Sequence, residues 1–311
     1  MDIVLLIAAI AGLWIGTELT ISSALVIAKR HHLSEFFVGL VILSIGSDLP
    51  EIAIAFDAGI KGSMGLDASD VLVGSAIGSV IGQIGLVLGI TGLISYLTMP
   101  GRFISRHGAM LLGAIILLYL VAWDGGISRT EGLILITMYV VYIFILLKGE
   151  ASPQHTPEAL VHGGTSSWIL LVTGLLVLIG SSELTVRSVV NLAVTFNVSE
   201  LIISLLVIGL GTSLPELSIS VSAILRKKTR LSVGNIIGST TLDTLVPIGI
   251  AAIFSPLRFD RGLLRFDLPY IFAMTFIVLV FFVRKRGLQK SEAGIILALY
   301  LVYVSVKLLQ F

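Results

Sequence analysis

Long apolar stretches follow one another along almost the whole chain, each near the roughly 20 residues that a helix needs to cross a bilayer. Short polar segments separate them. This pattern predicts ten spanning helices, over residues 3–28, 35–60, 69–96, 107–123, 130–148, 166–195, 200–225, 232–255, 266–283 and 291–309. We interpret the first as a span rather than a signal peptide, because it lacks a basic segment and a cleavage site and contains Glu18.

The second half of the chain repeats the first. The segment GSDLPE at 46–51 returns 165 positions later as GTSLPE at 211–216, and GSAIGS at 74–79 returns 160 positions later as GNIIGS at 234–239. Five spans reverse the chain's direction, so the two copies must be inverted relative to one another. The predicted fold class is therefore an all-α integral membrane protein of two inverted five-helix repeats. We place them at 1–148 and 166–311, joined by a polar loop at 149–165.

Composition and charge narrow the class of protein. Hydrophobic residues make up 56% of the chain and charged residues 13%, so the expected surroundings are a lipid bilayer. A net charge of +1 argues against nucleic acid as a partner. The chain has no cysteine, which excludes disulfide scaffolds and thiolate metal sites. The oligomeric state stays open.

Lysine and arginine are unevenly shared between the two sides of the predicted bundle. The loops after odd-numbered spans carry thirteen of them and the opposite loops carry six. Cytoplasmic loops are usually the richer in these residues. We therefore expect a plasma-membrane protein with a cytoplasmic central loop and both termini outside.

Six carboxylates lie well inside predicted spans, where each costs roughly 2.5–3.5 kcal/mol on insertion scales: Glu18, Asp48, Glu51, Glu183, Glu216 and Asp243. Glu183 can pair with Arg187 one turn away. Glu18 has no such partner in its own span, and we leave it open between packing and a place at the edge of a pathway. The other four lie near the centres of their spans, where no lysine or histidine can neutralise them. A bound cation or protons must do so.

Oxygen-bearing residues surround these carboxylates. Members of four pairs stand four positions apart, which predicts a shared helical face for each pair: Ser47 and Glu51, Thr212 and Glu216, Ser79 and Gln83, Ser239 and Asp243. Pro50 and Pro215 should also free the carbonyls of Gly46 and Gly211 from helical hydrogen bonds. Hard cations such as Ca²⁺ prefer such oxygen ligands.

At these residues the chain resembles the cation/Ca²⁺ exchanger superfamily, most closely its archaeal-type Na⁺/Ca²⁺ exchangers. The resemblance covers all ten spans and rests on GSDLPE (46–51), GSAIGSVIGQIG (74–85), GTSLPE (211–216) and GNIIGSTTLD (234–243). It implies an antiporter with Glu51 and Glu216 as the central carboxylates and spans 1 and 6 sliding across the other eight. It also implies ligand roles for Ser47, Thr212, Ser213, Ser79, Ser239 and Asp243, and for the main-chain carbonyls of Ser44 and Gly209.

Two positions depart from the family pattern. Asp48 stands where the family usually has serine, and Gln83 stands where asparagine is typical. Asp48 gives the predicted metal site a fourth potential negative charge, three positions from Glu51. Three consequences stay open: a proton as coupling ion, recruitment of K⁺ or an extra Na⁺, or a preference for another divalent cation.

The sequence thus predicts a transporter that exchanges Na⁺ for Ca²⁺ and exports Ca²⁺ from the cytoplasm, with no cofactor and no catalytic residues. An H⁺/Ca²⁺ exchanger on the same scaffold is the nearest alternative. An intramembrane protease with paired carboxylates is a weaker alternative, because catalysis needs one converging pair rather than a duplicated helix set. A passive cation channel is the other alternative.

Overall fold

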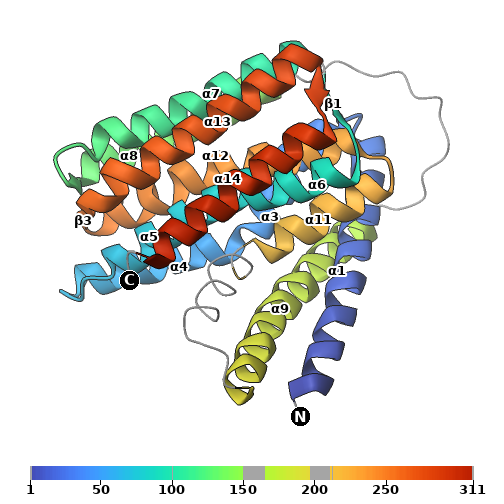
Figure 1. The fold of residues 1–311 in the computed structure, drawn as a ribbon, viewed down its shortest axis with the longest axis horizontal. Coiled ribbons are helices and arrows are strands. Elements are labelled where there is room, and N and C mark those ends of the chain that lie inside the picture. The colour runs from blue at the N-terminus through green and yellow to red at the C-terminus, as the bar shows by residue number, and fades with distance from the viewer. Residues whose placement is uncertain (1, 100, 150–164, 197–210, 212, 310–311) are drawn as a thin grey trace.

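Long helices running in similar directions make up most of the described part of the chain (Figure 1). The computed structural model describes residues 2–99, 101–149, 165–196, 211 and 213–309. The helices of the first half are α1 (Asp2–Arg30), α2 (Glu35–Phe37), the π-helical η1 (Val38–Leu43), α3 (Ser44–Ser47), α4 (Leu49–Ser63), α5 (Ser69–Gly82), the π-helical η2 (Gln83–Val87), α6 (Leu88–Ile94), α7 (Gly101–Val121) and α8 (Arg129–Gly149).

The second half contributes α9 (Thr165–Thr195), α11 (Leu214–Leu225), α12 (Thr229–Phe254), the π-helical η4 (Leu263–Asp267), α13 (Leu268–Lys285) and α14 (Lys290–Leu309). Four two-residue strands lie in the connections: β1 (Leu97–Thr98), β2 (Gly126–Ile127), β3 (Leu257–Arg258) and β4 (Gly287–Leu288). β1 pairs with β4 and β2 with β3, both antiparallel. Each pair joins a connection of the first half to one of the second.

Most predicted spans are found as helices. In the described residues, eight helices are long and apolar enough to cross a membrane, and the bent pair Glu35–Ser47 and Leu49–Ser63 makes up to nine. The predicted span 200–225 lies partly outside the described residues, and α11 is its described end. The predicted span 107–123 starts earlier than expected, at Gly101.

The second span breaks in its middle, where the helix axis bends by 47°. Asp48 leaves the helical conformation with φ −89° and ψ 10°, and α4 restarts at Leu49 with Pro50 in its first turn. Proline fits a first turn because its missing N–H would have no helical acceptor there. Ser213, 165 positions later, has nearly the same backbone angles (φ −110°, ψ 7°), and it precedes α11 and Pro215 in the same way.

Helix α12 forms the centre of the bundle. Nearly all of its side chains are buried, and it packs against η1, α4, α5, α7 and α8 of the first half. These neighbours belong to the main apolar cluster of the protein. The core is therefore assembled from both halves together rather than from each half separately.

Helices α1 and α9 pack along one another and angle away from the rest of the bundle (Figure 1). Their closest approach uses glycine on both sides. A Cβ on Gly16 would lie 2.6 Å from the Leu178 nitrogen, and a Cβ on Gly174 would lie 2.7 Å from the Thr20 nitrogen. Small residues permit this kind of contact between helices in a bilayer.

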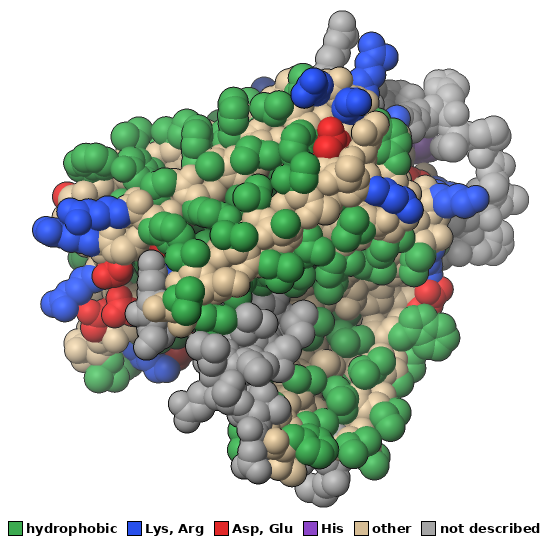
Figure 2. Space-filling view, in the orientation of Figure 1, with side chains coloured by type: hydrophobic (Ala, Val, Ile, Leu, Met, Phe, Trp, Pro, Cys, Tyr) green, Lys and Arg blue, Asp and Glu red, His purple; other side chains and the backbone are tan. Residues whose placement is uncertain are grey.

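The outer surface is apolar. Figure 2 shows one face covered largely by hydrophobic side chains, with lysine and arginine gathered toward two opposite ends. Large side chains such as Trp14, Leu120 and Trp123 are more than half exposed. This distribution fits a protein whose sides contact lipid and whose ends meet water.

Candidate cation site

Four carboxylates are buried together where the two halves meet. Asp48 lies at the break of the second span, Glu51 in the first turn of α4, Glu216 in the first turn of α11 and Asp243 in the middle of α12. Their exposed fractions are 0%, 7%, 0% and 0%. The charge of Asp48 interacts with those of Asp243, Glu216 and Glu51, and no described cationic side chain is among the interacting groups.

Asp48 occupies the N-cap position of α4 but does not cap it. An aspartate there ordinarily accepts a hydrogen bond from the helix's first backbone N–H groups. Here Oδ1 accepts from the Ser47 hydroxyl at 3.1 Å, and Oδ2 has no hydrogen-bond donor among the described residues. The side chain therefore gives up a stabilising local bond and lies with the other carboxylates instead.

Gln83 links the third span to Asp243. Its Nε2 donates to Asp243 Oδ2 at 2.9 Å and makes a longer contact of 3.4 Å to the Ser79 hydroxyl. The predicted shared face for residues 79 and 83 is thus found, although η2 begins at Gln83. Ser239 and Asp243 also share a face, because both lie in the continuous helix α12.

Many polar atoms of this cluster have no hydrogen-bond partner within the part of the chain that the structure describes. The partnerless atoms of the predicted ligand residues are Asp48 Oδ2, Glu51 Oε2, Gln83 Oε1, Ser213 Oγ, both carboxylate oxygens of Glu216, Ser239 Oγ and Asp243 Oδ1. Buried polar atoms are normally paired, because leaving one unpaired costs about 1–3 kcal/mol and more for a charged group. A concentration of unpaired oxygens fits a hard cation, which binds oxygen alone.

The prediction that Ser47 and Glu51 share the face of one helix is wrong, because the chain breaks at Asp48 and bends between them. Proline at position 50 cannot continue the hydrogen bonding of the preceding turn. The Ser44 carbonyl accepts the Asp48 N–H at 3.0 Å and lies 3.3 Å from the Ser47 hydroxyl, whose single hydrogen can serve either this carbonyl or Asp48 Oδ1.

Two predicted ligands, Thr212 and Gly209, lie outside the described residues. Within the described part, no three carboxylate or histidine side chains are close enough together to coordinate one metal ion by themselves. The cluster therefore gathers the charge, but hydroxyl and carbonyl oxygens would have to complete any coordination.

The two outer carboxylates of the sequence prediction are paired elsewhere. Glu183 binds Arg187 at 2.7 Å, as the spacing predicted. Glu18 pairs with Arg226, which follows α11 and also contacts the Ser22 hydroxyl at 3.1 Å. Both therefore serve as ion pairs outside the cluster.

The structure adds residues that the sequence did not single out. The Tyr139 hydroxyl on α8 has no hydrogen-bond partner and interacts with the charges of Asp48 and Asp243. Asn235 on α12 is fully buried, donates to the Ser220 hydroxyl at 3.3 Å and keeps an unpaired Oδ1. Asn235 stands four positions before Ser239, a spacing that could have identified it. Tyr139 lies in an apolar run that gave no signal.

The third and seventh spans touch at the cluster. A Cβ on Gly82 would lie 2.5 Å from the Ser213 hydroxyl oxygen. Glycine at position 82 therefore lets Ser213 reach its buried position beside α5.

Comparison with known proteins points to one family. The model of the sodium/calcium exchanger protein family matches residues 1–148 and 166–309. A putative antiporter, CaxA, of Alkalimonas amylolytica is 32% identical over 89% of both chains. The sodium/calcium exchanger MaX1 of Methanosarcina acetivorans is 23% identical over 94% of both chains.

Solved structures share the fold. Structures of the sodium-calcium exchanger NCX_Mj superpose on this chain with a TM-score of 0.82 and 24% identity, over 98% of this chain and 97% of the other. The likeness extends over nearly the entire described chain, including the pair α1 and α9.

Proposed function

The chain belongs to the sodium/calcium exchanger protein family, whose members are cation/Ca²⁺ antiporters, and from that premise we propose that it exchanges Na⁺ for Ca²⁺. One observation carries the proposal: Asp48, Glu51, Glu216 and Asp243 are buried together without a described cationic partner. Uncompensated charge of this kind is costly in a low-dielectric interior. A bound Ca²⁺, or several Na⁺ ions, would remove that cost.

We infer exchange by competition for the same oxygens. Glu51 and Glu216 each lie in the first turn of a helix with proline at its start, where the helix dipole favours negative charge. Ca²⁺ and Na⁺ need the same carboxylates, so occupancy by one displaces the other. Alternating access would couple their fluxes.

Seven further residues complete the proposed site. Their oxygens would supplement the four carboxylates, the last two from outside the described residues: Ser47, Ser79, Gln83, Ser213, Ser239, Thr212 and the carbonyl of Gly209. The Ser44 carbonyl is a further proposed ligand.

We further propose ten spans in two inverted halves, 1–148 and 166–311, with a cytoplasmic central loop and both termini outside. Three observations support this: the repeated sequence, the similar backbone angles of Asp48 and Ser213 before a helix with proline in its first turn, and the uneven distribution of lysine and arginine. The pair α1 and α9 would move against the remaining helices.

Transport by carboxylate variants tests the proposed site. Glu51→Gln and Glu216→Gln keep the size of the side chain and remove its charge, so each should abolish Na⁺-driven ⁴⁵Ca²⁺ uptake into proteoliposomes. Glu183→Gln is the matched control, because it removes an intramembrane carboxylate that is already paired with Arg187. Substantial uptake by both site variants would end the assignment.

The same vesicles distinguish the alternatives. Uptake driven by a pH gradient but not by a Na⁺ gradient would identify an H⁺/Ca²⁺ exchanger. Downhill Ca²⁺ flux without any counter-ion would identify a channel.

A further inference from the structure

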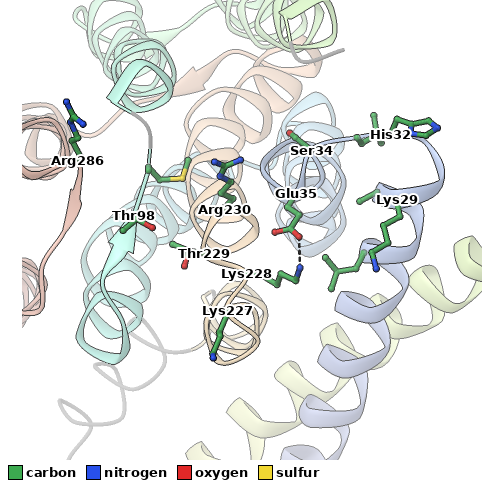
Figure 3. Close-up of a pocket in the computed structure, with 14 residues that line it drawn as sticks. Lys29, His32, Ser34, Glu35, Thr98, Lys227, Lys228, Thr229, Arg230 and Arg286 are labelled. Carbon is green, nitrogen blue, oxygen red and sulfur yellow. Dashed lines mark hydrogen bonds and ion pairs between the residues drawn. The ribbon is translucent and has the colours of Figure 1, made fainter. Parts of the chain in front are cut away.

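A cleft of about 680 Å³ opens at one end of the bundle (Figure 3), and none of the carboxylates of the cluster lines it. Its walls come from the end of α1 and the following link, from β1, from the link between α11 and α12, and from the residue before β4. All of these segments follow odd-numbered spans. The cleft therefore lies on the side that the lysine and arginine distribution assigns to the cytoplasm.

The lining of this cleft is strongly basic. Its ionisable residues comprise one carboxylate, Glu35, and six basic side chains: Lys29, His32, Lys227, Lys228, Arg230 and Arg286. Lys228 Nζ binds Glu35 Oε1 at 2.6 Å, which neutralises that one lysine. No carboxylate among the described residues forms an ion pair with Lys29, Lys227, Arg230 or Arg286. The lining therefore keeps an excess of four positive charges with His32 neutral.

Figure 3 shows how these groups are arranged. Arg230, Thr229 and the Lys228–Glu35 pair lie at the centre of the cleft, whereas His32 and Arg286 lie at its edges. The guanidinium at the centre carries several N–H donors in a planar fork, a geometry that matches phosphate oxygens. The Thr229 hydroxyl is a further donor beside it.

Three basic residues of the cleft have a left-handed backbone conformation, which is strained for residues other than glycine. Among described non-glycine residues, a positive φ occurs at His32 (54°), Lys227 (58°) and Arg286 (56°), and all three line this cleft. Each follows or ends a helix, where glycine would adopt the left-handed conformation without strain. A side chain there costs roughly 1–2 kcal/mol. Three such positions at one cleft are filled by a histidine, a lysine and an arginine.

One wall of the cleft is apolar. Leu25 and Ala28 of α1, with Leu33 and Met99, complete the lining beside the basic groups. The cleft thus offers hydrocarbon contact on the side of α1 and cationic donors on the side of α12.

We propose that this cleft binds a phosphate-bearing anion, either the headgroup of an anionic lipid or a free phosphate compound. The unpaired cations supply the charge, and Arg230 with Thr229 supplies the directed donors. This inference does not rest on the proposed exchange of Na⁺ and Ca²⁺, because none of the cleft residues belongs to the carboxylate cluster.

Thermal unfolding of the purified full chain in detergent, followed by tryptophan fluorescence, tests the proposal. The probes are sodium phosphate against sodium chloride at equal ionic strength, and dioctanoyl phosphatidic acid against dioctanoyl phosphatidylcholine. We expect sodium phosphate and phosphatidic acid, but neither of their controls, to raise the unfolding midpoint in a saturable way. A response to inorganic phosphate identifies a free anion as a sufficient ligand, and a response to phosphatidic acid alone identifies a lipid headgroup.

Two variants assign the response to the cleft. Arg230→Gln should raise the half-saturating probe concentration about tenfold, the loss expected for one charged hydrogen bond. Lys227→Gly should also weaken binding, yet it should not lower the midpoint of the protein without probe, because glycine relieves the positive φ. Arg284→Gln is the matched control, since it removes an exposed cation of the same side that does not line the cleft.

Two results would overturn the proposal. Equal weakening by Arg230→Gln and Arg284→Gln would show a diffuse positive surface rather than a site. No midpoint rise with either phosphate probe over its control would show that the cleft binds no such anion.

Discussion

At the scale of single residues, Asp48 is the feature that most sets this chain apart from the pattern it resembles. Its side chain makes no capping hydrogen bond to α4 and brings a fourth carboxylate to the cluster. Under the proposed function, Asp48 Oδ2, which has no hydrogen-bond donor among the described residues, would face a bound cation or proton.

Asp48→Ser should therefore change the ion profile while preserving transport. Removing one of four negative charges weakens the demand for a compensating ion, so the dependence of ⁴⁵Ca²⁺ uptake on Na⁺, K⁺ or pH should shift. Uptake measured with each gradient imposed separately provides the comparison. An unaltered profile would mark Asp48 as a spectator.

Gly82→Ala tests the contact between α5 and Ser213. The new methyl group would lie 2.5 Å from the Ser213 hydroxyl oxygen but 3.6 Å from its Cβ, so the hydroxyl has to rotate away. We expect slower Ca²⁺ uptake with little change in the unfolding midpoint. Gly74→Ala on the same helix is the control, since a Cβ there meets nothing within 4 Å. Equal behaviour of the two variants would contradict the close packing.

At the scale of residues, the sequence identified the side chains whose charge is unfavourable inside a membrane and missed uncharged polar side chains of the same cluster. Intramembrane carboxylates stand out because each must be compensated, and four of the six met in one cluster. Tyr139 gives no such signal, since a tyrosine in an apolar run is usually packing. The position of its hydroxyl near Asp48 and Asp243 depends on the tertiary contact of α8 with α12.

At the scale of elements, the last two helices of each half are joined by a buried polar contact. His107 on α7 lies 3.1 Å from the Tyr142 hydroxyl on α8. Asp267 at the end of η4, 160 positions after His107, accepts from the Tyr303 hydroxyl on α14. The two tyrosines are 161 positions apart, so the two contacts occupy similar but not identical places in the repeat. The sequence did not reveal this, because histidine and aspartate share no chemical pattern.

Lys307→Met should destabilise the protein through Asp267. Lys307 Nζ binds the fully buried Asp267 carboxylate at 2.9 Å, and its loss leaves that charge with the tyrosine alone. A fall of about 1.5–3 kcal/mol in unfolding free energy follows from losing a bond to a buried charge. Lys61→Met, which breaks the exposed pair with Asp57, should cost below about 1 kcal/mol. Denaturant unfolding in detergent gives the unfolding free energy of both variants. Equal losses would contradict the prediction that the buried ion pair contributes more than the exposed one.

The helices themselves were largely predictable, because length and hydropathy determine a span in lipid. Pro50 predicted disturbed hydrogen bonding in the second span, but not a bend large enough to separate the helical faces of Ser47 and Glu51. The π-helical segments η1, η2 and η4 and the strand pairs were not predicted. They depend on how neighbouring helices pack and on which connections meet, information that a local pattern does not contain.

At the scale of the whole molecule, the chain's lack of cysteine allows its orientation to be tested cleanly. Arg284→Cys and Asp124→Cys place single thiols on opposite ends of the bundle, since Arg284 lies in the last turn of α13 and Asp124 follows α7. A membrane-impermeant maleimide should label residue 124 from outside intact cells and residue 284 only after the cytoplasmic face is opened. The reverse pattern would invert the proposed topology.

The internal repeat predicted two halves, and the structure shows how closely they depend on one another. Helix α12 of the second half is packed by helices of the first, α1 is packed by α9, and both strand pairs cross between halves. The repeat alone could not show this, because it describes similarity between segments and not contact between them.

The central position of α12 has a consequence for how the protein is made. A ribosome delivers the first five spans to the membrane before α12 has been synthesised, so η1, α4 and α8 must wait beside lipid or insertion factors with their future contact faces uncovered. Assembly of the nascent chain is therefore expected to be late and cooperative, because the first-half helices can complete their packing only after α12 has been inserted.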